Sequence, residues 1–161
     1  MTPRQMGMAA GAGSALLLAA ALAFQAAGYA PCELCILQRW PHLAAAVAGA
    51  LVAVLGWRRW LAALGLVAAL AAFGLAVYHA GVEMQLWAGP QHCSGGVSNL
   101  AAMSTQDLLA AINAAPVVRC DQVAWSLFGI SMAGWNAICS AGLAALWLAC
   151  LRGRDRQRGL A

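Results

Sequence analysis

Four long apolar stretches alternate with polar segments along the 161-residue chain. Each stretch is free of charged side chains and approaches the roughly 20 residues that a helix needs to cross the hydrocarbon core of a bilayer. The pattern therefore predicts an all-α membrane protein with a bundle of four transmembrane helices. The expected spans lie at about 8–28, 42–57, 61–80 and 129–151.

Composition supports a membrane environment for the whole chain. Hydrophobic residues make up 63% of the sequence and charged residues only 9%, whereas a soluble domain carries about 25% charged residues. No linker or change in composition divides the chain, so we expect one domain over residues 1–161. Alanine and glycine are abundant, which in membrane helices marks surfaces where two backbones approach closely.

The arginines are distributed unevenly about the four stretches. Under the positive-inside rule, arginine-rich segments are cytoplasmic, which places both termini in the cytoplasm and, in a bacterium, predicts an inner-membrane protein. The segments 29–41 and 81–124 would then face the periplasm. The net charge of +4 follows from this topology and does not indicate nucleic-acid binding. Seven of the nine arginines lie on the predicted cytoplasmic side: Arg4, Arg58, Arg59, Arg152, Arg154, Arg156 and Arg158.

The first stretch has a second interpretation as a secretory signal peptide. Arg4 precedes it, and small residues follow near positions 25–27. Its apolar run is longer than the usual 7–15 residues of such a signal, which favours an uncleaved helix. Either outcome leaves the periplasmic segments on the same side of the membrane.

The longer periplasmic segment contains a predicted short helix at 104–115. Ser104 or Thr105 can cap its N-terminus, Asp107 suits its first turn, and Pro116 ends it. Apolar residues on one face would let this helix lie on the membrane surface.

A first pair of cysteines lies in the shorter periplasmic segment. Cys32 and Cys35 form a Cys-Glu-Leu-Cys motif, whose spacing allows a small disulfide ring. The pKa of such a thiol is lowered by a helix N-terminus or a nearby cation. Arg39 follows Cys35 by one helical turn and would favour its thiolate. Alternatively, Arg39 anchors the helix to lipid phosphates at the interface.

A second pair, Cys93 and Cys120, lies in the longer periplasmic segment. Turn-forming residues beside Cys93 would allow its sulfur to reach a partner protein. The alternative is a structural disulfide that only tightens the loop. A zinc site built from both pairs and His92 has enough ligands, but the adjacent His92 and Cys93 fit one ion poorly. Because the periplasm also favours disulfides, we expect no metal.

Other polar residues within the spans suit packing rather than chemistry. Cys139 and Cys150 would lie about 16 Å apart along one helix, which is too far for a disulfide, so we interpret them as small packing residues. Ser131 and Asn136 are interpreted as hydrogen-bonding between helices.

Together these residues give the chain a close resemblance to the disulfide-bond formation protein B (DsbB) family over nearly its full length. A single Cys-x-x-Cys motif is weak evidence, but two cysteine pairs and four spans in this order are specific. The residues that carry the resemblance are Pro31, Cys32, Cys35 and Arg39, the segment 78–83, Cys93 to Gly95, Arg119 to Asp121, Trp125, and the segment 129–132.

The resemblance implies a membrane thiol oxidase that reoxidises a periplasmic thioredoxin-fold protein of the DsbA type. Cys93 would form the mixed disulfide with that partner, and Cys120 would exchange with Cys93 and with Cys32. Cys35 would meet a bound quinone, ubiquinone or menaquinone, as a thiolate. Arg39 would hold an oxygen of the quinone ring.

His79 is a further candidate for the quinone pocket, with an interhelical hydrogen bond as the alternative. His42, Glu83 and Trp40 are weaker candidates for the same pocket.

Two other functions remain possible from the sequence. A quinone reductase of the vitamin K epoxide reductase type also uses loop cysteines and a Cys-x-x-Cys motif, but there the motif lies within a late helix. A non-catalytic scaffold with structural disulfides would have no need of Arg39 beside Cys35.

Overall fold

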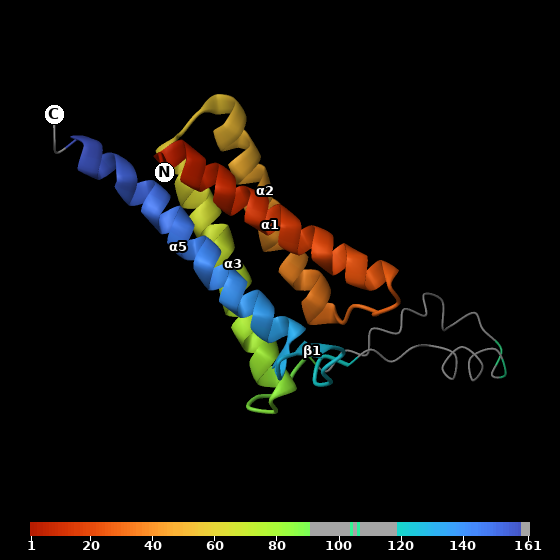
Figure 1. The fold of residues 1–161 in the computed structure, drawn as a ribbon. Coiled ribbons are helices and arrows are strands. Elements are labelled where there is room, and N and C mark those ends of the chain that lie inside the picture. Colours follow the sequence, from red (N-terminus) through yellow and green to blue (C-terminus); the bar gives the residue numbers. More distant parts are fainter. Residues whose placement is uncertain (91–103, 105, 107–118, 159–161) are drawn as a thin grey trace.

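The computed structural model describes residues 1–90, 104, 106 and 119–158, with side chains described up to residue 153. Its framework is an up-and-down bundle of four long helices (Figure 1). Each helix is long and apolar enough to cross a membrane, which confirms the predicted fold class. The helices are α1 (Pro3–Ala26), α2 (Glu33–Leu55), α3 (Arg59–Glu83) and α5 (Met132–Arg158).

The helices pack through small residues, as the glycine and alanine content suggested. Neighbours around the bundle are α1 with α2, α2 with α3, α3 with α5, and α5 with α1. A Cβ atom on Gly11 would lie 2.5 Å from the Cα of Gly49, so α1 and α2 approach too closely there for any larger residue. Between α3 and α5, the ring of Trp147 fills the space beside Gly65.

The second helix begins earlier than the expected span of 42–57. Cys32 is the N-cap of α2, and its side chain accepts a hydrogen bond from the backbone N–H of Cys35. Pro41 lies within the helix, although proline commonly ends helices. Much of the segment expected as a periplasmic loop is therefore helical, which brings Arg39 onto a helix. Likewise, α3 continues past residue 80 to Glu83.

A small β-hairpin precedes α5, where the sequence had suggested that the fourth helix begins at residue 129. Strand β1 (Ser126–Leu127) pairs antiparallel with β2 (Ile130–Ser131). Phe128 and Gly129 form the turn with φ angles of 53° and 76°, as a two-residue hairpin turn requires. The apolar residues of this segment had concealed the hairpin, because a short apolar run suits either strand or helix.

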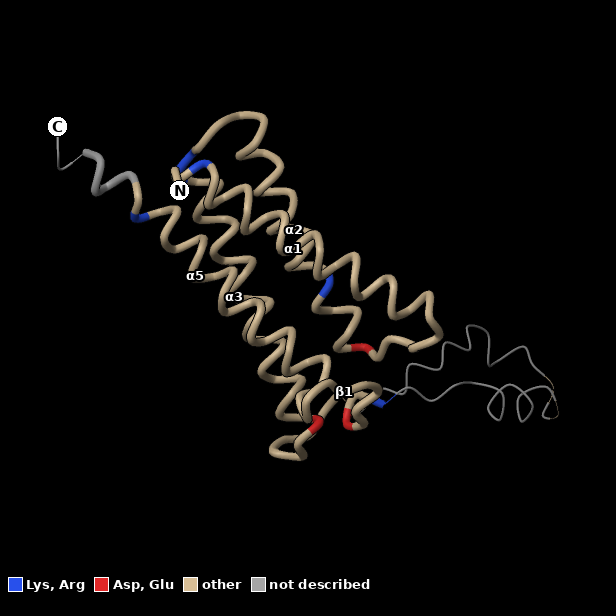
Figure 2. Tube along the Cα trace, viewed as in Figure 1, with Lys and Arg blue, Asp and Glu red and all other residues tan. Residues whose placement is uncertain are grey.

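Charge separates the two ends of the bundle (Figure 2). Arginines gather at the end where α1 begins and α5 ends, and acidic residues occur at the opposite end. Arg4 donates a hydrogen bond of 2.7 Å to the backbone oxygen of Ala53, which ties α1 to the end of α2. Along the bundle, apolar side chains such as Leu16 and Val67 are 70% and 64% exposed, as expected of a surface that faces lipid.

Three sequence predictions lie outside the described residues. These are the structure of the surface helix at 104–115, of which only residues 104 and 106 are described, and the placement of His92 and Cys93.

Candidate functional site

The first cysteine pair lies at the start of α2, at the end of the bundle opposite the termini. Cys32 is buried and Cys35 is half-buried, and their sulfurs lie 2.8 Å apart. The Sγ of Cys32 also accepts the backbone N–H of Cys35 at 3.3 Å. Both sulfurs thus lie at a helix N-terminus, where the helix dipole and the free N–H groups favour negative charge.

The two thiols of this motif are not equivalent. The hydrogen bond to Cys35 and burial both raise the pKa of the Cys32 thiol, because both favour its protonated form. Cys32 is therefore harder to ionise than an ordinary thiol. This arrangement leaves Cys35 as the sulfur better placed to carry a negative charge.

Cys120 provides a third sulfur beside this pair. It packs against a small buried cluster formed by Cys32, Leu34 and Val82, and its side chain interacts with that of Cys32. The sequence placed Cys120 in a loop 85 residues after Cys35, and the fold brings it to the Cys-x-x-Cys motif. Three cysteines of the predicted set are thereby adjacent.

An ion pair flanks Cys120 on the protein surface. The guanidinium of Arg119 donates two hydrogen bonds to the carboxylate of Asp121, at 2.6 and 2.9 Å. The hydrogen bonds from Arg119 lower the pKa of this carboxyl group. Both charged groups therefore remain ionised beside Cys120 at neutral pH.

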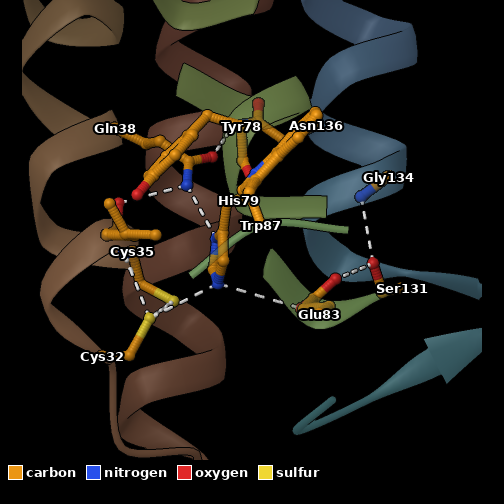
Figure 3. A network of polar contacts seen from close by, with 11 residues as sticks. Cys32, Cys35, Gln38, Tyr78, His79, Glu83, Trp87, Ser131, Gly134 and Asn136 are labelled. Atoms are coloured by element: carbon orange, nitrogen blue, oxygen red, sulfur yellow. Dashed lines mark hydrogen bonds and ion pairs between the residues drawn. The ribbon is translucent and has the colours of Figure 1, made fainter. Parts of the chain in front are cut away.

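His79 reaches the same cysteines from α3. Its Nε2 lies 3.6 Å from the Sγ of Cys32, and its Nδ1 lies 2.8 Å from the side-chain nitrogen of Gln38 on α2 (Figure 3). His79 also lines the cavity described below. The hydrogen bond between helices is therefore observed, whereas the role of His79 in a quinone pocket stays a prediction.

Gln38 was missed by the sequence reasoning. It is buried and bonds to three other groups: the Leu34 backbone, His79, and Asn136 on α5. The available signal was its position one helical turn after Cys35, on the same face of α2. A polar side chain at such a position in a membrane helix is costly unless it has partners or a function.

Asn136 confirms the expected hydrogen bonds between helices, whereas Ser131 lies in β2, just before α5. The side-chain oxygen of Asn136 accepts from His42 at 2.8 Å, and its nitrogen donates to Gln38 at 2.6 Å. The hydroxyl of Ser131 donates to the Glu83 carboxylate. The network thus joins α2, α3 and α5 around the cysteines.

A cavity of about 240 Å³ lies beside the motif. Arg39 borders it, and its Nη1 donates a 2.7 Å hydrogen bond to the side chain of Gln25 on α1. The Nε of Arg39 is buried and has no hydrogen-bond partner among the described residues. The apolar part of the lining includes Leu17, Leu18, Phe24, Trp125, Met132 and Trp135.

The structure also shows where Trp40 and the two cysteines of α5 lie relative to the cavity. Trp40 is 66% exposed and does not border the cavity. Cys150 is buried in the packed core, as expected, and its thiol donates to the backbone oxygen of Pro3. Cys139 borders the cavity, which its interpretation as a packing residue did not anticipate.

Fold and site together define a class: a four-helix membrane protein with a Cys-x-x-Cys motif and a third cysteine at one end. Comparison with known proteins makes the assignment specific. The family model of disulfide bond formation protein DsbB matches residues 3–150. The chain belongs to this family.

Individual relatives agree with the family model. Disulfide bond formation protein B of Verminephrobacter eiseniae is 33% identical over 157 residues, which cover 93% of this chain and 86% of that protein. The protein of the same name from Polaromonas naphthalenivorans is 31% identical over 96% of this chain and 95% of its own length. No solved structure matches the chain significantly. Family membership gives the chain a disulfide oxidoreductase role in a membrane.

Proposed function

We propose that this protein is a thiol oxidase that reoxidises the dithiol of a periplasmic DsbA-type protein and passes the electrons to a membrane quinone. The observation that carries the proposal is that Cys32 contacts both Cys35 and Cys120, and that Cys32 and Cys35 border a cavity. A structural disulfide would need two sulfurs, whereas exchange needs a third within reach of the bond under attack.

The thiol steps follow from this order of sulfurs. The Cys120 thiolate attacks the Cys32 sulfur of a Cys32–Cys35 disulfide, which forms a Cys32–Cys120 bond and releases Cys35 as a thiolate. Attack by Cys93 on Cys120 then forms a Cys93–Cys120 disulfide and returns Cys32. The resulting Cys93–Cys120 disulfide is the one that would exchange with the dithiol of the partner protein. Each step exchanges one disulfide for another, so the number of electrons on sulfur is unchanged.

The cavity residues fit a quinone. Arg39 offers a buried Nε–H without a partner among the described residues, which suits a carbonyl oxygen. The apolar walls suit the body of a lipid-soluble molecule. A quinone, when bound, would accept two electrons and two protons. Arg39 would hold and orient its oxygen, and its positive charge would attract the Cys35 thiolate one helical turn away.

Orientation in the membrane completes the proposal. The arginine-rich end that carries the termini is assigned to the cytoplasm of a bacterium by the positive-inside rule. The thiol site then faces the periplasm, where disulfides form and persist. This orientation makes the site accessible to a secreted dithiol protein and to quinone from the inner membrane.

A trapping experiment tests the proposed function. Replacing Cys120 with alanine removes the sulfur that would resolve the mixed disulfide at Cys93. We expect a covalent adduct between Cys93 and a soluble DsbA-type protein, visible on a non-reducing gel and abolished by the additional change Cys93→Ala. The absence of an adduct, together with undisturbed oxidation of secreted proteins, would overturn the proposal.

A further inference from the structure

A chain of buried hydrogen bonds leads from α5 to the cysteine motif (Figure 3). The side-chain nitrogen of Asn136 donates to Gln38 Oε1 at 2.6 Å. The side-chain nitrogen of Gln38 lies 3.1 Å from the backbone oxygen of Leu34 and 2.8 Å from His79 Nδ1. Gln38 and His79 are only 6% and 4% exposed, so each polar atom depends on these partners.

The partners fix which way the Gln38 amide points. A backbone carbonyl can only accept hydrogen bonds, so the atom facing Leu34 must be the Gln38 nitrogen, and its oxygen faces Asn136. The same nitrogen faces His79 Nδ1 and donates to it. His79 Nδ1 is therefore unprotonated, and the neutral ring carries its hydrogen on Nε2.

The Nε2–H of His79 faces the groups that carry negative charge during exchange. Cys32 Sγ lies 3.6 Å from it and Glu83 Oε1 lies 3.9 Å from it, while the backbone of Cys120 forms a hydrogen bond with the same ring. The titratable groups around Cys32 are thus Cys35 on α2, His79 and Glu83 on α3, and Cys120 ahead of β1. Of these, His79 is the one whose neutral form holds a donor toward Cys32 from a neighbouring helix.

We propose that Gln38 is a positioning residue that locks His79 in its Nε2–H form, so that His79 stabilises Cys32 as a departing thiolate. The inference rests on the proposed function, in which attack of Cys93 on the Cys32–Cys120 disulfide releases Cys32. The bond from Cys93 to Cys120 forms as the bond from Cys120 to Cys32 breaks. The electron pair of the broken bond stays on Cys32, and no proton is transferred.

A hydrogen bond from His79 would offset the features of the site that make Cys32 a poor leaving group. The hydrogen bond to Cys35 and burial raise the pKa of Cys32, and a thiol with a raised pKa is a poor leaving group in exchange. A hydrogen bond to the thiolate acts in the opposite direction, because it favours the charged form. His79 would thereby restore a leaving ability that burial removes.

The same network argues against a metal at this site. Ligand atoms of Cys32, Cys35 and His79 lie within 4.8 Å of one another, a spacing that a thiophilic ion could use. A histidine ligand must present a lone pair to the ion and donate its other N–H to an acceptor. Gln38 presents a donor to Nδ1 instead, so the lone pair of His79 faces Gln38 and its hydrogen faces the sulfur.

The experiment measures the ionisation of Cys32 directly, without partner or quinone. In full-length protein with Cys35, Cys93 and Cys120 replaced by serine, alkylation of Cys32 is followed against pH by mass spectrometry. We expect His79→Ala to move the midpoint upward by about one unit, which is roughly a tenfold lower rate at neutral pH. His79→Gln, whose amide can place an N–H near the position of Nε2, should restore much of the lost rate.

A second variant reverses the tautomer while keeping the shape of Gln38. The carboxylate in Gln38→Glu would accept from Nδ1–H, leaving a lone pair on Nε2 that faces Cys32. We expect an upward shift in the Cys32 midpoint at least as large as that of His79→Ala. Ser140→Ala is the control, because Ser140 donates to Asn136 Oδ1 outside the path to His79, and it should leave the midpoint unchanged.

Unchanged midpoints in both His79→Ala and Gln38→Glu would overturn the inference. A downward shift in Gln38→Glu would do so as well. Because the readout is the reactivity of one thiol, the inference can fail while the chain still oxidises a DsbA-type protein. Conversely, the proposed function can fail while the shift is seen.

Discussion

The two ends of the bundle are built on opposite principles. The end near the termini is a packed apolar core, in which Trp147 is fully buried between helices that approach through glycines. The thiol end holds a cavity, three sulfurs and a hydrogen-bonded set of buried polar side chains. Buried polar groups and cavities both cost stability. The close packing at one end of the bundle therefore supplies stability that offsets the cost of the cavity and the buried polar groups at the other.

If the two ends have these separate roles, changes at the thiol end should lower activity, and changes that disturb packing at the other end should lower stability. The largest effect is expected from Cys35→Ser, which removes the thiolate nearest the cavity. Oxidation of a reduced DsbA-type protein by membranes should fall by about a thousandfold or more, as for other covalent catalysts that lose their nucleophile. The midpoint of thermal unfolding in detergent should stay the same. Cys150→Ser, the same change at the packed end, should leave turnover intact. Loss of turnover in this variant would contradict the separate roles of the two ends.

Arg39→Ala should give the next largest effect on activity. Loss of a hydrogen bond from a charged group costs about 1.5–3 kcal/mol, which corresponds to a ten- to hundredfold higher KM for quinone. Exchange between the Cys93–Cys120 disulfide and the dithiol protein should continue at its normal rate, because the Cys35 thiolate that Arg39 would attract takes no part in that step. Steady-state kinetics with a soluble quinone analogue would measure both, and unchanged quinone kinetics would remove Arg39 from the proposed site.

Gly65→Ala probes the packed end. A Cβ atom at this position would lie 2.4 Å from the Trp147 ring, and the buried ring has no space into which to move. We expect the free energy of unfolding to fall by about 1–3 kcal/mol. Denaturation of the protein in detergent would measure this loss. Gly74→Ala on the same helix is the matched control, since a Cβ there meets nothing within 4 Å. Equal stability of the two variants would show that close packing does not support this end.

The smallest effect is expected at the exposed pair of Arg119 and Asp121. An aspartate whose pKa is lowered in the folded protein adds stability above its unfolded pKa and loses it as the pH falls through the folded value. Because the pair is exposed, solvent screens this contribution. Asp121→Asn should therefore leave the unfolding temperature unchanged at pH 7, and any small difference should shrink further as the pH falls below about 4. A clear loss of stability at pH 7 would assign this pair a structural role.

The sequence predicted the fold well because its signals were global. Four apolar stretches and uneven arginines identify a membrane bundle without any knowledge of contacts. The hairpin before α5 escaped prediction because it depends on two residues with positive φ, Phe128 and Gly129. Phenylalanine is not a residue that normally signals such a turn.

The site was predicted in part for a similar reason. The Cys-x-x-Cys motif and Arg39 stand out by local spacing, so sequence could identify them. Gln38 could not be identified as important, because its role depends on His79 from another helix and Asn136 from a third. The contact between Cys120 and Cys32 could not be predicted from spacing either, because it depends on where the chain returns to the bundle before β1.

The central claim is that Cys120 and Cys32 exchange directly. The most direct measurement is disulfide mapping by mass spectrometry in a Cys35→Ala/Cys93→Ala variant, equilibrated in detergent with a glutathione redox buffer. Of the four cysteines proposed to take part in exchange, only Cys32 and Cys120 then remain, and Cys139 and Cys150 of α5 are unchanged. The account predicts a Cys32–Cys120 disulfide within one chain, formed in preference to glutathione adducts. Finding both cysteines reduced, or each capped separately by glutathione, would contradict it.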